Sequence, residues 1–118
     1  MSWLRPRLRP ARARAPLVLY TRRACSLCDE MKAELARAGL VGRSDWSERD
    51  VDADPMLAER LGSSVPVLEV GGRLAFRARI RAGTLERRLA QLERAYRRRG
   101  PGPGAAREAA AGGEEGWA

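Results

Sequence analysis

The sequence predicts one small α/β domain whose strands and helices follow the order β-α-β-α-β-β-α. Short apolar runs alternate with stretches of helical periodicity, and glycines and prolines separate the segments. The only two cysteines, Cys25 and Cys28, stand where the first apolar run gives way to the first helical stretch. A chain of 118 residues is long enough to bury one modest hydrophobic core.

The chain begins with a basic stretch that we expect to be a flexible arm. Residues 1–15 contain five arginines, two prolines and no acidic residue, so they are poorly suited to a helix. No apolar segment follows these charges, and the stretch therefore does not resemble a secretory signal.

The first strand and first helix flank the cysteines. Residues 16–20 form a continuous apolar run, which predicts a central strand that is buried on both faces. Residues 26–38 predict a helix that ends at Gly39. Its buried face comprises positions at helical spacing: Cys28, Met31, Leu35 and Ala38. Cys28 is therefore expected on the buried face, whereas Cys25 is expected at the exposed mouth.

The middle of the chain predicts a weaker strand and a short helix. Residues 44–52 are polar, as suits an edge strand. The two strongly apolar residues of this segment have opposite parity: Trp46 and Val51. A bulge, or a strand limited to about residues 48–51, would reconcile them. Asp54 and Pro55 have the pattern of an N-cap and first helical residue, and Gly62 ends that helix.

A β-hairpin follows. Residues 67–70 and 73–77 predict two strands joined by a Gly-Gly turn. Alternation along the second strand predicts that Leu74 and Phe76 lie on the same face.

The last predicted element is a helix over residues 84–99. Thr84 suits its N-cap, and three arginines in its last turn suit the negative end of the helix dipole. A Gly-Pro-rich stretch stops this helix, and we expect residues 100–118 to form a disordered tail rich in Gly, Ala and Glu. The folded domain is therefore predicted over residues 16–99.

The spacing and position of the cysteines indicate thiol–disulfide chemistry. Cys-x-x-Cys places two sulfurs close enough to form a disulfide, and a helix N-terminus favours the thiolate and lowers the thiol pKa. Two alternatives use the same residues. The pair could be half of a metal site, although the chain has no third cysteine and no histidine, or it could be two inert buried cysteines.

The net charge of +8 comes almost entirely from arginine, since Lys32 is the only lysine. This excess motivates an alternative in which the domain is a non-catalytic binding module for nucleic acid or an acidic protein. Few aromatic residues are available for base stacking, so we do not expect nucleic acid as the partner. No apolar run is long enough to span a bilayer. Two cysteines without a secretory segment predict a cytoplasmic location.

Three motifs, in order, resemble the small bacterial glutaredoxin-like proteins of the thioredoxin superfamily. They lie at residues 17–30 (LVLYTRRACSLCDE), 50–55 (DVDADP) and 65–68 (VPVL). The resemblance covers about residues 16–96. It implies a three-layer thioredoxin-like sandwich with a four-stranded mixed sheet in the order 2-1-3-4. The first and third helices would cover one face and the second helix the other.

The resemblance also implies roles for individual residues. Cys25 would be the nucleophile and Cys28 the resolving thiol. Val65-Pro66 would be a cis peptide beside the dithiol, where Val65 could pair with a substrate backbone. Arg22 lies where glutaredoxins commonly carry lysine, and it would favour the thiolate or attract a substrate carboxylate.

The chain departs from typical glutaredoxins at two places. Ser-Leu, rather than Pro-Tyr, separates the cysteines. Residues 77–83 (RARIRAG) are basic where glutaredoxins place Gly-Gly and an Asp that holds glutathione.

The sequence therefore predicts a dithiol–disulfide oxidoreductase that reduces protein or low-molecular-weight disulfides. It would carry no bound cofactor, would draw on glutathione or another thiol donor, and would act as a monomer away from the membrane. The binding module, and a dimer that binds a metal or an iron–sulfur cluster through its cysteine pairs, remain the alternatives.

Overall fold

The computed structural model describes residues 14–107. Its elements follow the predicted order: β1 (Leu17–Thr21), α2 (Ser26–Arg37), β2 (Trp46–Asp50), the one-turn 3-10 helix η2 (Val51–Ala53), α3 (Pro55–Leu61), β3 (Val67–Val70), β4 (Arg73–Arg77) and α4 (Leu85–Arg99). Most of the predicted basic arm, residues 1–13, lies outside the described part. Ala15, assigned to that arm, is instead fully buried against the core.

The four strands form one mixed sheet in the order β2-β1-β3-β4, which confirms the predicted topology. β1 runs parallel to β2 and antiparallel to β3, and β3 runs antiparallel to β4. The continuous apolar run explains why β1 is central, because all of its first four residues are buried and no face of it needs to be polar.

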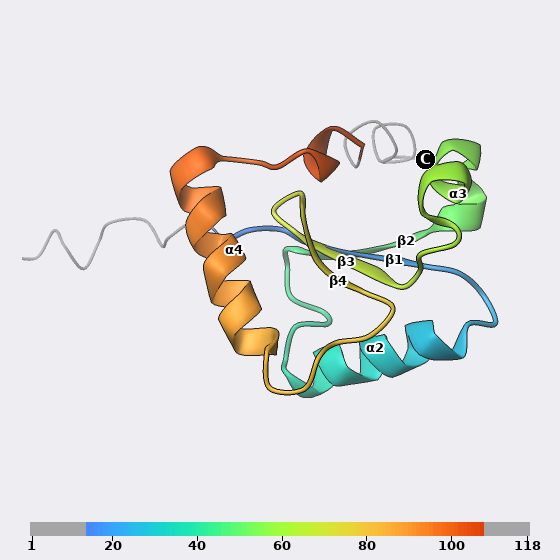
Figure 1. The fold of residues 1–118 in the computed structure, drawn as a ribbon, viewed down its shortest axis with the longest axis horizontal. Helices are drawn as coiled ribbons and strands as arrows, with labels where there is room; N and C mark the ends of the chain where they lie inside the picture. Colours follow the sequence, from blue (N-terminus) through green and yellow to red (C-terminus); the bar gives the residue numbers. More distant parts are fainter. Residues whose placement is uncertain (1–13, 108–118) are drawn as a thin grey trace, which may run out of the picture.

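Helices cover both faces of the sheet, so the domain has three layers (Figure 1). One core lies between the sheet and the helices α2 and α4; its largest members include Leu17, Leu19, Met31, Leu35 and Leu92. A second core lies between the sheet and α3; it contains Val18, Tyr20, Val51, Leu57 and Val67. The two cores agree with the predicted arrangement. The first and third helices of the domain, α2 and α4, pack on one face of the sheet, and the second, α3, packs on the other.

The second strand ends earlier than the pattern suggested. β2 begins at Trp46 and ends at Asp50, so Val51 does not belong to it. Val51 instead starts η2 and is fully buried against α3. Trp46 and Val51 have opposite parity because Trp46 belongs to the strand and Val51 to the helix that follows it, so no bulge within β2 is required.

A bulge does occur in the β3–β4 hairpin, where the sequence indicated none. The register shifts between Leu68 and Glu69, so that Phe76 pairs with Leu68 but Leu74 pairs with Glu69. Leu74 and Phe76 therefore lie on opposite faces of the sheet, which corrects the prediction from simple alternation. Leu74 is 41% exposed, whereas Phe76 is 8% exposed.

Two helix ends also differ in detail from expectation. Ala38, assigned to the buried face of the first helix, is the C-cap of α2 and is exposed. Thr84 occupies the N-cap position of α4, but its side chain makes no capping bond to that helix. Its hydroxyl donates instead to the carbonyl of Arg81 at 2.7 Å, which tightens the preceding turn.

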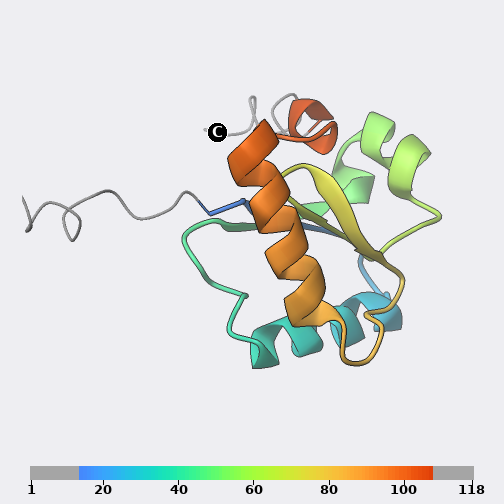
Figure 2. The same cartoon turned by 60° about the vertical axis from the view of Figure 1, so that its left-hand side comes forward.

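Residues 100–107, the described part of the segment after α4, pack against the domain, in contrast to the predicted disordered tail. The amides of Gly102 and Gly104 donate to the carbonyls of Gly71 and Gly72, at 2.8 and 2.7 Å. The chain thus crosses the end of the β3–β4 hairpin and continues as a helical turn on the α3 side of the sheet (Figures 1 and 2). The rest of the predicted tail, residues 108–118, lies outside the described part.

Candidate active site

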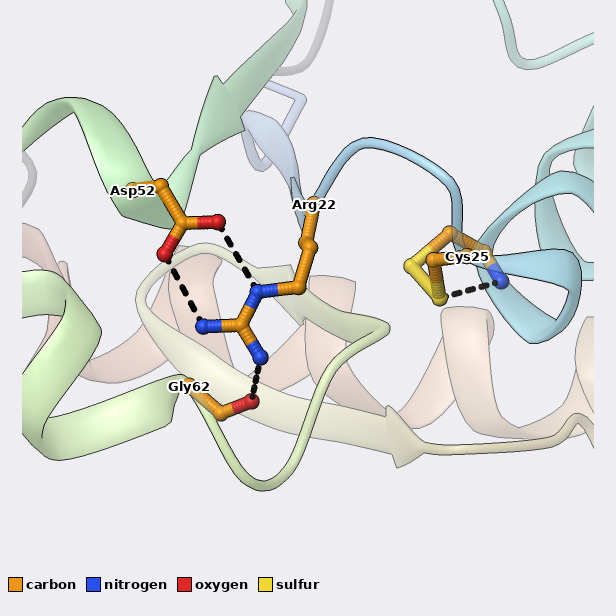
Figure 3. The surroundings of a disulfide bond; sticks show 5 residues. Arg22, Cys25, Asp52 and Gly62 are labelled. Atoms are coloured by element: carbon orange, nitrogen blue, oxygen red, sulfur yellow. Dashed lines mark hydrogen bonds and ion pairs between the residues drawn. A yellow bond between two sulfur atoms is a disulfide. The ribbon is translucent and has the colours of Figure 1, made fainter.

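The two cysteines lie at the junction between β1 and α2. Cys25 has an extended backbone and forms the N-cap of α2, and Cys28 follows in the first turn. The two residues are joined by a disulfide, with their Cα atoms 5.2 Å apart (Figure 3). The described part of the chain therefore contains no free thiol in this state.

The environments of the two sulfurs differ. Cys25 is partly exposed, whereas Cys28 is 3% exposed and faces the interior. The amide of Cys28 donates a hydrogen bond of 3.1 Å to the sulfur of Cys25. A helix N-terminus thus directs an N–H group and its partial positive charge at the more accessible sulfur, an arrangement that favours negative charge there.

The backbone is strained immediately before the disulfide. Ala24 has a φ of 52°, in the left-handed region that residues other than glycine rarely adopt. Such strain is commonly found at functional sites. Here it turns the chain from the end of β1 into the start of α2 and so presents Cys25 at the surface.

Arg22 points toward η2 and the end of α3 rather than toward the disulfide (Figure 3). Its Nε and Nη2 donate to the two carboxylate oxygens of Asp52, each at 2.9 Å, and its Nη1 donates to the carbonyl of Gly62 at 2.8 Å. The hydrogen bond from Arg22 holds the pKa of the Asp52 carboxyl below its ordinary value. Arg22 thus ties together two loops, and its assignment to substrate binding stays a prediction.

The loop before β3 contains a cis peptide bond between Val65 and Pro66. Val65 is half-buried and Pro66 is fully buried. The carbonyl of Pro66 accepts a hydrogen bond of 2.8 Å from the amide of Ala78, which follows β4. This loop is therefore held from two sides, by Arg22 through Gly62 and by the end of the β4 strand.

A comparison with known protein families finds one that contains this site. Residues 16–90 match the model of the glutaredoxin-like domain (DUF836). The chain belongs to this glutaredoxin-like family. The matched region contains the disulfide, Arg22 and its partners, the cis peptide and the whole sheet. No curated protein matches the chain.

Three residues of this glutaredoxin-like site were not singled out by sequence reasoning: Asp52, Gly62 and Ala78. Asp52 lies within the DVDADP motif, so its acidic character was visible, but its partner was not. Ala78 has a φ of 68°, and the amide of Arg79 donates to the carbonyl of Arg77 across it at 2.7 Å. An alanine in this conformation gives no signal in the sequence, because glycine is the residue that normally marks such a turn.

The basic segment after β4 runs along α2. Arg79 forms an exposed ion pair, at 3.2 Å, with Glu30, which stands two residues after Cys28. Residues 77–83 include no carboxylate, but Glu30 and Glu34 of α2 and Glu86 of α4 lie beside this segment.

Within residues 14–107 of one chain, no three Cys, His, Asp or Glu residues come together as a metal site. The alternative of a metal site shared by the cysteine pairs of two subunits stays a prediction. Over the same residues, no helix has both the length and the apolar character needed to cross a membrane.

Proposed function

We propose that this glutaredoxin-like protein is a dithiol–disulfide oxidoreductase that uses Cys25 as nucleophile and Cys28 as resolving thiol. The observation that carries the proposal is the asymmetry of the disulfide. The partly exposed sulfur sits at a helix N-terminus, and the other is buried one turn behind it. Nucleophilic attack requires an accessible thiolate, whereas resolution requires only that the second thiol reach the first.

The reaction proceeds by two thiol–disulfide exchanges. The thiolate of Cys25 attacks one sulfur of a substrate disulfide, which forms a mixed disulfide and expels the other substrate sulfur as a thiolate. The thiolate of Cys28 then attacks the sulfur of Cys25 and expels the remaining substrate sulfur. Two electrons pass from the dithiol to the substrate, and the protein is left with the Cys25–Cys28 disulfide. Two equivalents of a monothiol, or one external dithiol, return it to the reduced state.

Supporting groups position the substrate in this proposal. In this proposal the backbone of Val65 pairs with an extended substrate. Arg22 and Pro66 keep this loop in place. Glutathione or a different thiol supplies the electrons, and we propose the cytoplasm, where thiols are kept reduced, as the compartment. We also propose that the protein acts as a monomer.

Reduction of insulin disulfides in the presence of a thiol donor tests the proposal. We expect the wild-type protein to accelerate the reaction, Cys25→Ser to abolish the acceleration, and Ser26→Ala to retain it. Cys28→Ser should accumulate a mixed disulfide with the substrate, visible as a mass increase that a reductant reverses. Equal rates for the wild type and Cys25→Ser would overturn the proposal.

A further inference from the structure

An arginine-lined hollow lies between β4 and α4, on the edge of the domain formed by the last strand of the sheet. The hollow has a volume of about 520 Å³. Its wall includes Arg81, Arg87, Arg88 and Arg94 and contains no aspartate or glutamate. Figure 2 shows α4 lying beside the hairpin that carries β4. The charge is therefore gathered at a concave surface and not spread evenly over the domain.

One of these arginines is part of the framework. Arg88 donates to the carbonyl of Leu74 on β4 and to the side chain of Gln91 on α4, both at 2.8 Å. It thereby joins β4 to α4 and also lines the hollow. Because the Leu74 carbonyl of this edge strand already accepts a hydrogen bond from Arg88, a partner segment would contact the side chains here and would not extend the sheet at that point.

The other three arginines are exposed and available. The side chains of Arg81, Arg87 and Arg94 have no hydrogen-bond or ion-pair partner within residues 14–107. The carbonyl of Arg81 accepts bonds from both the amide and the hydroxyl of Thr84, which fixes the turn that carries it. These three residues thus line one hollow whose wall contains no carboxylate to balance their charge.

The acidic residues of α4 lie on its other flank. Positions 87 and 94 are seven residues apart and share one face of the helix, whereas Glu86 and Glu93 are offset from it by about 100°. Glu93 is also engaged by Arg43, at 3.9 Å. The helix therefore presents its positive side to the hollow, and its own carboxylates do not neutralise it.

We propose that this hollow docks an extended acidic segment of a partner protein, with carboxylates paired to Arg87 and Arg94. These two positions are about 10.5 Å apart along the helix axis, a span that about three extended residues cover. Guanidinium groups pair well with carboxylates, because the planar fork of donors matches the two oxygens. The docked partner would also carry the disulfide that is exchanged at Cys25, and this part of the proposal rests on the proposed function.

A protein segment fits this surface better than a nucleic acid does. Recognition of single-stranded nucleic acid uses exposed aromatic rings on which the bases stack. The one aromatic residue in the wall is Phe76, which is 8% exposed and packed into the core. The surface offers charge without stacking, and that combination suits carboxylate side chains on a peptide.

Fluorescence anisotropy with a dye-labelled octaglutamate peptide tests the proposal, using the full-length oxidised protein. We expect saturable binding that weakens as salt is raised, since the contacts are solvent-exposed. The double variant Arg87→Glu/Arg94→Glu should weaken binding roughly tenfold or more. The matched double variant Arg23→Glu/Arg60→Glu, at two exposed arginines outside the hollow, has the same net charge and should change binding by no more than about twofold. Arg87→Gln/Arg94→Gln gives a second variant without new repulsion, and circular dichroism verifies folding.

Three results would overturn the proposal. One is the absence of saturable binding, and another is equal weakening by the two matched double variants, which would indicate net charge alone. The third is tighter binding of a thymidine oligonucleotide of equal charge, which would assign the surface to nucleic acid. The binding measurement involves no thiol chemistry. A failure of the proposed oxidoreductase activity would therefore appear separately, as intact peptide binding without disulfide reduction.

Discussion

Arg22 and Asp52 are joined by a two-point ion pair across 30 positions of sequence, with both N–O distances at 2.9 Å. The same guanidinium binds the carbonyl of Gly62 at 2.8 Å. Arg22 stands three residues before Cys25, and Gly62 stands three residues before Val65. One side chain therefore sets the loop that carries the nucleophile against the loop that carries the cis peptide.

Asp52→Ala should loosen the loop before β3 without unfolding the domain. Arg22 would lose two of its three bonds, and its hold on Gly62 would weaken because the guanidinium would be free to turn into solvent. We expect faster amide hydrogen exchange over residues 62–65 and little change in Tm. Glu59→Ala, on the neighbouring helix α3, is the control. Identical exchange in the wild type and Asp52→Ala would show that the ion pair does not order this loop.

The two reduced thiols should differ in their reactivity toward an alkylating agent. Cys25 is partly exposed at the helix N-terminus, whereas Cys28 is 3% exposed. Limited iodoacetamide treatment of the reduced protein, followed by peptide mass spectrometry, should label Cys25 at least about tenfold faster. Denaturation in urea before labelling serves as the control and should remove most of the difference. Preferential labelling of Cys28 in the folded protein would reverse the proposed roles.

Truncation of the two apolar residues of β4 should have very different effects on stability. Phe76→Ala removes a ring from the core and should cost about 3–5 kcal/mol of unfolding free energy. Leu74→Ala, at a position that is 41% exposed, should cost less than about 1 kcal/mol. Urea unfolding of both variants measures the two values. Similar costs would mean that Leu74 is buried in solution and that the bulge is absent.

Local sequence signals were sufficient for the order of elements and for the cysteine pair. Gly and Pro mark most element boundaries, and the Cys-x-x-Cys spacing is meaningful wherever a strand gives way to a helix. The bulge in β4 was not predictable, because Leu74 and Phe76 alternate as in a regular strand and only the pairing with β3 shows the shift. The contact of Arg22 with Asp52 was equally hidden, since the sequence contains many arginines and pairing depends on the fold.

Composition also failed to predict the structure of the segment after α4. Glycine and proline at positions 100–104 do end the helix, as expected, but they also permit a close crossing over the hairpin. A Cβ added at Gly102 or Gly104 would collide with Gly72 or Glu69, respectively. The glycines that suggested disorder are thus required for tight packing against the hairpin. Composition alone cannot separate these two roles, because the difference depends on the surface against which the glycines pack.

The ion pair between Arg43 and Asp45 should make stability sensitive to acid. The hydrogen bond from Arg43 lowers the pKa of the Asp45 carboxyl below its ordinary value in the folded state. A lowered folded pKa means that the carboxylate stabilises the fold fully above the unfolded pKa of about 3.9, and that this contribution is lost as the pH falls through the folded value.

We therefore expect Asp45→Asn to be less stable than the wild type at neutral pH, with the gap narrowing as the pH falls below about 4. Urea unfolding across that range measures the gap. Glu59→Gln, which has no side-chain partner within residues 14–107, should track the wild type throughout. A gap that stays constant with pH would mean that the loss at Asp45 is not electrostatic.

Removal of Arg107 should destabilise the domain although it lies beyond the last labelled helix. Its guanidinium forms an ion pair with Glu69, whose side chain is only 7% exposed, and lies 5.5 Å from the centre of the Tyr20 ring. Arg107→Ala leaves the buried carboxylate without this partner and should cost about 3 kcal/mol of unfolding free energy.

Replacement of both members of this pair should cost less than replacement of the arginine alone. In Glu69→Leu/Arg107→Leu no buried charge remains, and apolar side chains of similar length can fill the site. Urea unfolding of the single and double variants separates the two cases. If Arg107→Ala were as stable as the wild type, the ion pair between Arg107 and Glu69 would contribute nothing to the stability of the fold. If the double variant were the less stable of the two, the ion pair itself, and not the relief of a buried charge, would hold this segment against the sheet.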